Sequence, residues 1–348
     1  FGEYIARTNV HDCDSLFVDF ENSTSRNVDK NLGPIASVLS SQNTRLVTLQ
    51  LFGEGLIRLG KINEALSLNA TLKVLDISNN HIHCGVELGK VLCVNKTLMR
   101  LNVASNCLGS DGIIQILNSL KTNSSLVWLD ISDNSNASET STDECASILG
   151  EVLKVNKSLK YLDMSQNDIG DEAAAAIAEG LKQNETLEKI NVFGQYILHK
   201  GIVALADMLK SNTTLKTLDA GSCHAYLDSS PFPDTQPGIA LGEALKVNES
   251  LRELCLTNFG FSTEDTICLS EGLQVNTSLE KLNLYENAIG SKGIMAIANA
   301  LSYNTTLQEL NIDCSNFDSG GSGLVYPDID TAAANEFAVV GYNELALS

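Results

Sequence analysis

Four short stretches of this sequence contain residue types that could carry out chemistry, and each is an incomplete motif. The stretch Gly55–Lys61 has most of a phosphate-binding loop, but Ile62 stands where that motif needs a serine or threonine to hold magnesium. The string Asp318–Gly321 matches the nucleophile string of one class of serine proteases, but the sequence lacks the histidine and aspartate context that a catalytic triad requires. We therefore expect neither nucleotide binding nor proteolysis.

Two further stretches carry potential metal ligands. The stretch His81–Cys84 brings three zinc-binding side chains together, but structural zinc takes four ligands and no second pair is present. The stretch Asp133–Glu144 has the length of a calcium-binding loop, but Ser138 replaces its central glycine and Ala137 replaces a ligand. The sequence therefore predicts no metal site, no cofactor and no enzymatic activity.

One motif, Asn-x-Ser/Thr-Leu-x-x-Leu-x-Ile/Leu, recurs along the chain and is clear at Asn95–Val103. Its first leucines are 26 to 36 residues apart, most often 28. A regular period of this size predicts a solenoid in which each repeat packs only on its neighbours. We expect eleven strands, opening at Leu16, Leu46, Leu72, Leu98, Leu126, Leu159, Leu187, Leu215, Leu251, Leu279 and Leu307.

One repeat indicates how the others fold. Leu162 and Met164 alternate with polar residues, which predicts a short, half-buried strand. Asn167 then turns the chain, with its side-chain amide bonded to the backbone of the loop. Apolar residues at helical spacing predict a helix over Asp171–Lys182. One strand and one helix per repeat predict an α/β horseshoe with a parallel sheet on its concave face and helices on its convex face.

The ends of the chain depart from the repeat. We expect an N-terminal cap at residues 1–15 and the repeat array at residues 16–313. The glycine- and serine-rich stretch Ser319–Gly323 predicts a loop. A capping helix from Ala332 to Leu345 would follow it, so residues 314–348 form a C-terminal loop and cap.

Three strings, Leu72–Asn80, Leu159–Gly170 and Leu279–Gly290, resemble the ribonuclease-inhibitor-like class of leucine-rich repeats, as found in NOD-like receptors and the Ran GTPase-activating protein. The resemblance implies a leucine-rich repeat solenoid and a non-catalytic module or scaffold for protein-protein interaction, with the sensor region of a NOD-like receptor as one setting. The alternative that it implies is GTPase activation. Arg58 is then the nearest equivalent of the activator's arginine, although its surroundings do not match that family's motif.

The charge of the chain restricts its partners. With 43 acidic and 23 basic residues the net charge is −20, which argues against nucleic acid and against an anionic membrane surface. It favours a protein partner with a basic surface, although solubility alone could also explain it. No apolar run is long enough to span a bilayer. The nine cysteines are odd in number and scattered, which is typical of reduced thiols and predicts a cytoplasmic protein. We also expect a monomer.

The repeat alignment places candidate binding residues on the concave face. The fifth position is a row of short polar residues, for which we expect hydrogen bonds between neighbouring strands. The third position is varied and includes the only tryptophan. Exposed aromatic residues there would anchor a partner, unless helices or loops bury them. The candidates are Arg100, Trp128, Tyr161 and Lys189 at the third position, and Phe193 and Tyr285 at the seventh.

The repeats that begin at Leu126 and Leu215 carry insertions after their strands. Loops on a rigid scaffold often carry function, although a neutral insertion is an equal alternative. Both insertions are acidic, and the second contains three of the five prolines. The candidate contacts in them are Glu139, Asp143, Tyr226, Phe232 and Asp234.

Eleven Asn-x-Ser/Thr sequons would ordinarily suggest a glycosylated, secreted protein. Nine of them, from Asn69 to Asn304, fall three residues before a strand leucine. A function in the turn of the repeat explains these nine. Only Asn22 and Asn136 lie elsewhere, so the sequons give little support for secretion.

Overall fold

The computed structural model describes residues 14–19, 32–41, 44–53, 56–83, 85–134, 142–167, 170–194, 197–221 and 236–312. Strands and helices alternate along these residues. The strands are β1 (Ser15–Asp19), β2 (Thr48–Phe52), β3 (Val74–Asp76), β4 (Arg100–Asn102), β5 (Trp128–Asp130), β6 (Tyr161–Asp163), β7 (Lys189–Asn191), β8 (Thr217–Asp219), β9 (Glu253–Cys255), β10 (Lys281–Asn283) and β11 (Glu309–Asn311). The helices are α3 (Gly33–Ser40), α4 (Lys61–Leu68), α5 (Gly85–Val94), α6 (Gly109–Ser119), α7 (Thr142–Val155), α8 (Asp171–Leu181), α9 (His199–Leu209), α10 (Gln236–Val247), α11 (Thr263–Val275) and α12 (Gly290–Leu301).

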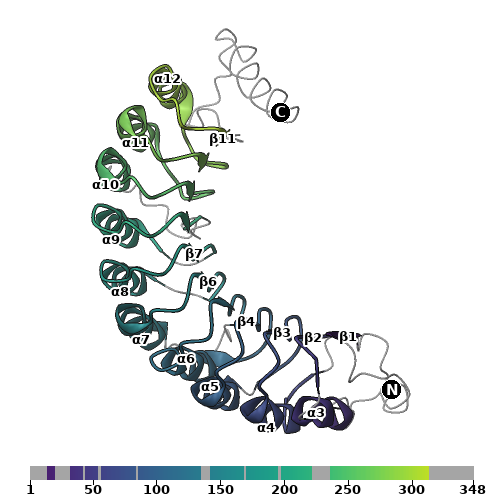
Figure 1. The fold of residues 1–348 in the computed structure, drawn as a ribbon. Coiled ribbons are helices and arrows are strands. Elements are labelled where there is room, and N and C mark those ends of the chain that lie inside the picture. The colour runs from purple at the N-terminus through teal and green to yellow at the C-terminus, as the bar shows by residue number, and fades with distance from the viewer. Residues whose placement is uncertain are drawn as a thin grey trace. The chain divides into compact units, whose positions relative to one another are not determined.

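The chain divides into two compact units, Phe1–Ile190 and Asn191–Ser348, with the boundary inside β7. In the first unit, β1 to β6 pair in parallel and in sequence order. In the second unit, β8 to β11 do the same. Within each unit the strands line the inner side of the curve and the helices lie on the outer side (Figure 1). The predicted α/β solenoid with a parallel sheet is therefore confirmed in each unit.

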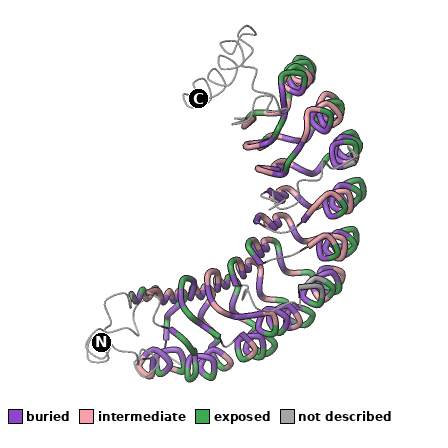
Figure 2. The backbone as a smooth tube through the Cα atoms, turned by 180° about the vertical axis from the view of Figure 1, so that it is seen from behind, coloured by how far each residue is buried: buried purple, intermediate pink, exposed green. Residues whose placement is uncertain are grey.

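The hydrophobic core lies between the strands and the helices. Leu72, Leu75 and Ile77 of one repeat are fully buried, whereas Val74 and Asp76 between them are partly exposed. Each helix contributes one apolar face, which in α8 includes Ile177 and other buried residues. Figure 2 shows this layer as buried backbone along the strands and the inner side of the helices. The alternation in each strand thus leaves its third and fifth positions on the inner, solvent-facing side.

The first repeat differs from the sequence-based alignment. Strand register pairs Leu16 with Leu49, not with Leu46, so Leu16 lies three residues later in its repeat than predicted. Ser15, assigned to the N-terminal cap, is the first residue of β1. Three consecutive apolar residues, Leu16 to Val18, give no alternation from which a register could be read. Each of the other ten predicted leucines lies two residues before its strand. Residues 1–13 and 314–348 of the predicted caps lie outside the described residues.

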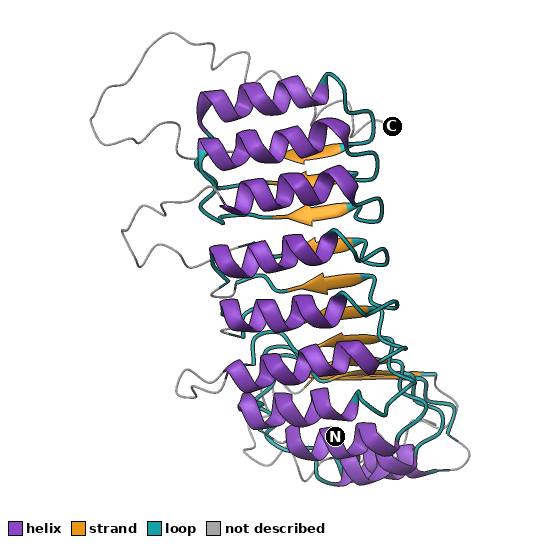
Figure 3. Ribbon diagram, turned by 90° about the vertical axis from the view of Figure 1, so that its left-hand side faces the viewer, coloured by secondary structure: helices purple, strands orange, loops and turns teal. Residues whose placement is uncertain are grey.

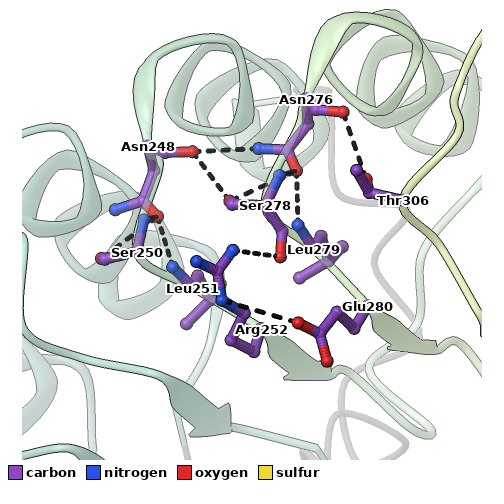
Figure 4. Close-up of polar contacts among 9 residues, drawn as sticks. All are labelled: Asn248, Ser250, Leu251, Arg252, Asn276, Ser278, Leu279, Glu280 and Thr306. Atoms are coloured by element: carbon purple, nitrogen blue, oxygen red, sulfur yellow. Dashed lines mark hydrogen bonds and ion pairs between the residues drawn. The ribbon is translucent and has the colours of Figure 1, made fainter.

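A column of asparagines joins each helix to the strand that follows it. The side-chain oxygen of Asn276 accepts hydrogen bonds from the backbone N–H groups of Ser278 (2.9 Å) and Leu279 (2.7 Å). Its side-chain nitrogen donates to the backbone oxygen of Leu245 (2.8 Å) in the preceding repeat. It also donates to the backbone oxygen of Asn248 (3.0 Å), as Figure 4 shows. One side chain therefore closes its own turn and holds the turn before it.

The carbonyl half of this arrangement recurs at nine positions. In each, the asparagine oxygen accepts from the second and third residues that follow. The nitrogen to which a glycan would be attached donates a hydrogen bond to the backbone in Asn69, Asn95, Asn123, Asn156, Asn184, Asn248, Asn276 and Asn304. Eight of the nine residues, all but Asn304, are only 3–7% exposed. The prediction that these sequons serve the turn is confirmed for Asn69, Asn95, Asn123, Asn156, Asn184, Asn212, Asn248, Asn276 and Asn304.

A second column of buried asparagines holds the loop between each strand and the next helix. Asn167 donates to the backbone oxygens of Met164 (2.9 Å) and Ile131 (2.9 Å), and it accepts from the N–H group of Asn134 (2.9 Å). The predicted bonds between Asn167 and its loop are therefore confirmed. The same column contains Asn80, Asn106 and Asn134 in the first unit and Asn287 in the second.

We predict that Asn276→Ala destabilises the second unit strongly. The substitution leaves buried backbone donors and acceptors without partners, and we expect a loss of about 2–4 kcal/mol in the free energy of unfolding. Urea denaturation followed by circular dichroism measures this loss.

Thr277 is the matched control, because it is the next residue and its side chain is exposed. Thr277→Ala should change the free energy of unfolding by less than about 0.5 kcal/mol. Equal effects of the two substitutions would contradict the proposed importance of the asparagine column.

Candidate functional site

Four of the predicted binding residues form one row on the inner face of the first unit. Register pairs Arg100 with Trp128, and Trp128 with Tyr161. The N–H group of Lys189 donates to the backbone oxygen of Lys160 (3.0 Å), which places β7 beside β6. Equivalent residues of adjacent strands lie about 4.8 Å apart, so the four side chains are neighbours. We call Arg100, Trp128, Tyr161 and Lys189 the aromatic row.

The two rings of the aromatic row stack on each other, and a cation covers each end. The rings of Trp128 and Tyr161 have centroids 4.7 Å apart and planes within 6°. The guanidinium carbon of Arg100 lies 3.8 Å from the Trp128 centroid, and Nζ of Lys189 lies 5.8 Å from the Tyr161 centroid. Aromatic pairs and cation–π contacts contribute roughly 0.5–1.5 kcal/mol each. The row is therefore ordered before any partner arrives, while all four side chains keep exposed or partly exposed surface.

A row of polar residues lies beside the aromatic row, at the fifth position of the repeat. We call Asp76, Asn102, Asp130 and Asp163 the acidic row. The side-chain oxygen of Asp130 accepts from the backbone N–H (3.0 Å) and the hydroxyl (2.6 Å) of Ser132. Asp76 and Asp163 bond in the same way to the serine two residues on.

The predicted hydrogen bonds between strands account for little of the acidic row. One such bond is present, from Asn102 to Asp76 (3.3 Å). The stronger contacts are local, because each aspartate is followed by a turn whose serine offers two donors. These local hydrogen bonds were not predicted from the sequence, although the motif Asp-x-Ser that makes them recurs at Asp76–Ser78, Asp130–Ser132 and Asp163–Ser165.

Burial and the charges of the acidic row change the protonation of residues in both rows. Burial raises the pKa of Asp130, and the negative charges of Asp163 and Asp76 raise it further, against the two bonds from Ser132. Burial also raises the pKa of Tyr161, as do the charge of Asp163 and the hydrogen bond that the Tyr161 hydroxyl donates to it (3.1 Å). Tyr161 is thus a neutral donor across the physiological range.

The inner face of the second unit is built differently at the same positions. Lys281 and Glu309 form an ion pair (2.8 Å), and Thr217 donates to Glu253 (3.3 Å). These exposed polar pairs satisfy one another and offer no stacked rings. The aromatic row is therefore a local feature of the first unit and not a general property of the repeat.

The remaining candidates lie apart from this row in the sequence. Phe193 and Tyr285 belong to the second unit, follow β7 and β10, and are partly buried. Their N–H groups donate to the strand-end residues Asn191 and Asn283. Of the insertion candidates, Asp143 lies in the first turn of α7, without a described side chain. Glu139, Tyr226, Phe232 and Asp234 lie outside the described residues.

The described residues of the stretches that resemble zinc-binding and phosphate-binding motifs belong to the helices and turns of the repeats. His83 contacts the backbone oxygen of Cys107 through Nδ1 (3.2 Å), and Cys84 is not described. Lys61 begins α4, where Ile62 is buried in the core. Arg58 is exposed in the loop before that helix.

In the part of the chain that the structure describes, no group of three His, Cys, Asp or Glu side chains could hold a metal ion. No disulfide joins the five described cysteines, and none of the described helices is long and apolar enough to cross a membrane.

Two family models match parts of the sequence. A model described as a leucine-rich repeat matches residues 68–83, 94–117 and 155–178. The chain is a leucine-rich repeat solenoid. A second model, described as the TMOD/LMOD leucine-rich domain, matches residues 236–322, a range that includes all the elements from α10 to β11.

Two solved structures show a distant likeness to the solenoid. One is titled "Leiomodin-1 Actin-Binding Site 2 (ABS2)" and is 21% identical, with 56% of this chain and 88% of that chain covered and a TM-score of 0.35. The other is the C-terminal domain of tropomodulin from Caenorhabditis elegans, which is 19% identical, with 47% and 92% covered and a TM-score of 0.38. Scores this low leave the function to be argued from the residues themselves.

We predict that Asp130→Asn stabilises the solenoid at pH 7. The raised pKa means that ionised Asp130 is disfavoured in the folded state, so this penalty is present at pH 7 and decreases as the pH falls through the raised pKa. Asparagine keeps an oxygen for Ser132 without the charge. The gain in unfolding free energy should therefore be larger at pH 7 than at pH 4, as urea denaturation at both values would measure.

Glu249→Gln is the control for this experiment, since it removes one charge from an exposed turn of the same chain. It should give no comparable gain at pH 7. A destabilised Asp130→Asn protein at pH 7 would show that the charge of Asp130 is favourable in the folded state, contrary to the prediction.

Proposed function

We propose that this solenoid is a non-catalytic protein-binding module or scaffold whose main contact is the aromatic row of the first unit. The observation that carries the proposal is the stack of Trp128 on Tyr161 with Arg100 and Lys189 at its ends. Tryptophan, tyrosine and arginine are the residues that most often dominate the binding energy of protein interfaces.

The stack also lowers the entropic cost of binding. Immobilising a flexible side chain at an interface costs about 0.5–1.5 kcal/mol, and rings that are already held by their neighbours avoid much of that cost. The Tyr161 hydroxyl is fixed by Asp163, which orders the row further. A partner would meet a preformed surface on a rigid sheet.

The acidic row indicates the charge of the partner. Asp76 and Asp130 are partly exposed, and no lysine or arginine among the described residues forms an ion pair with either. A basic side chain of the partner would neutralise them and relieve their mutual repulsion. Together with the net charge of −20, this favours a partner with a basic surface that is guided to the inner face electrostatically.

The wider setting of the module is also part of the proposal. The sensor region of a NOD-like receptor, suggested by the sequence resemblance, is one setting in the cytoplasm. The TMOD/LMOD match at residues 236–322 suggests another, and makes actin, which the leiomodin-1 title names, the first partner to test. The GTPase-activator alternative rests on Arg58 alone, and no contact of this exposed residue favours it.

We predict that Trp128→Ala/Tyr161→Ala weakens binding of the cognate protein at least tenfold. Removing the rings also frees Arg100 and Lys189 from their ordered positions. Purified actin is the first ligand for a titration by calorimetry or fluorescence, followed by affinity capture from cell extract at low and moderate salt.

Thr217→Ala/Lys281→Ala is the matched control, because it truncates two side chains at the same repeat position in the second unit. It should leave the affinity within about twofold, since exposed ion pairs contribute little. A partner that binds the ring-deleted protein as well as it binds the unaltered chain would refute the aromatic row as its site.

A further inference from the structure

The edge of the first unit that carries the helix-to-strand turns combines exposed apolar residues with lysines over four consecutive repeats. Figure 3 shows these turns together on one edge of the repeats. In the repeats from α4 to β6, three positions of each repeat face this edge: the residue before the column asparagine, the residue after it, and the residue after the strand leucine. We call the surface that they form the turn edge.

The asparagine column determines how the turn edge is aligned. Asn95 donates to the backbone of Leu66 and Asn69, and Asn123 donates to the backbone of Leu92 and Asn95. Each turn is thereby bonded to the one before it. The residues beside the asparagines must therefore follow one another in rows, whatever their own side chains are.

Large apolar side chains are exposed along the turn edge. Leu68 and Val94, at the ends of α4 and α5, are 83% and 56% exposed, and Val155, at the end of α7, is 53% exposed. Met99, which follows a strand leucine, is 46% exposed. An aligned set of this kind, unlike a single exposed leucine, is typical of an interaction surface. Val247, Val275 and Tyr303 of the second unit are exposed at the same position, so it is the charge beside the apolar row that distinguishes the first unit.

The charged residues of the turn edge are lysines. The three positions hold Lys73, Lys96, Lys157 and Lys160 from α4 to the start of β6, and no aspartate or glutamate. Lys160 is paired with Glu188 of the next repeat (2.6 Å). No ion pair is present for Lys73, Lys96 and Lys157 among the described residues, nor for Lys121 in the turn after α6.

The same positions in the second unit show that the repeat does not require this charge. Glu249 follows its column asparagine, and Glu280 follows its strand leucine and lies near Arg252 (3.7 Å). Basic residues also follow the strand leucine in this unit, at Lys216 and Arg252, and the next repeat of the first unit has Glu185 and Glu188. The stretch from α4 to the start of β6 therefore differs in holding four lysines and no acidic residue at these positions, in a chain that carries −20 in total.

We propose that the turn edge of the first unit binds an acidic amphipathic helix of a partner protein. Neighbouring helices pack about 8–10 Å apart, so Leu68 at the end of α4 and Val94 at the end of α5 are separated by about the same distance. A bound helix repeats its apolar face every seven residues, or about 10.5 Å, and so can match this row. Acidic residues beside that apolar face would meet Lys96, Lys121 and Lys157.

The charge of the whole chain distinguishes this partner from an anionic membrane. A membrane would bring a wide negative surface close to the acidic residues of the solenoid, whereas a helix covers only the turn edge. At physiological salt, charges interact over about 8 Å, so the lysines nearest to a bound helix would dominate its binding. An acidic protein segment is therefore favoured.

The test uses the full chain and two synthetic helices of equal length, one of leucine and glutamate and one of leucine and lysine. We expect the leucine–glutamate helix to bind with an affinity that falls as salt is added, and the leucine–lysine helix to bind at least tenfold more weakly. Val94→Asp/Lys96→Glu should weaken binding of the leucine–glutamate helix at least tenfold. Lys96→Ala/Lys157→Ala, a milder change of exposed residues, should weaken it less but measurably.

The matched control is Val275→Asp/Thr277→Glu, which alters the same two row positions in the second unit and should leave binding unchanged. Equal loss in that control, or equal affinity for the two synthetic helices, would overturn the proposal. So would binding of phosphatidylserine–phosphatidylcholine vesicles without binding of the acidic helix. Trp128→Ala/Tyr161→Ala should bind the acidic helix normally, which separates the turn edge from the aromatic row.

Discussion

The column of buried asparagines is the constraint on which the rest of the solenoid depends. A helix that ends against a strand leaves carbonyl groups of its last turn and N–H groups of the next segment without partners. One asparagine satisfies both kinds, because its side chain carries an acceptor and a donor together. In Asn248, the oxygen accepts from Ser250 and Leu251 while the nitrogen donates to Leu209 and Asn212. Only asparagine and glutamine carry a carbonyl acceptor and an NH₂ group with two donors on one planar amide, and glutamine has an additional methylene to accommodate.

The asparagine column aligns the repeats, and this alignment brings residues of like charge close together. Equivalent side chains of successive repeats lie about 4.8 Å apart on the strands, so a residue type that recurs at one position meets its own kind. In the acidic row, burial raises the pKa of Asp130 and the neighbouring charges of Asp163 and Asp76 add to this increase. Asn102 separates Asp76 from Asp130, and it donates to the former. In the aromatic row, the same proximity is favourable, because rings stack and cations prefer ring faces.

Much of the fold could be predicted from the sequence, because the same pattern of residues recurs in every repeat. The period, the parallel strands, the buried leucines and the use of the sequon asparagines all follow from residues that recur. The first repeat could not be aligned, since Leu16 to Val18 show no alternation. At the inner face, the third position was recognised as a candidate site, but stacking depends on rotamers that spacing does not determine. The local bonds of the aspartates were not predicted. Strand pairing suggests contacts between neighbouring strands, whereas these bonds are made to the serine two residues later in the same repeat.

The direction of the helices contributes to the distribution of charge within each unit. They run in the same direction within each unit, so their N-terminal ends face one edge and their C-terminal ends the other. Acidic residues stabilise the first turn of a helix and basic residues the last. Glu64, Glu87 and Asp111 lie in first turns, whereas Lys154 lies in a last turn and Lys182 follows one. This preference explains only part of the charge at the turn edge, because Lys73 and Lys160 follow strand leucines and belong to no helix. Their positive charge is not required by a helix end or by the turn, which is the reason for assigning it to a partner.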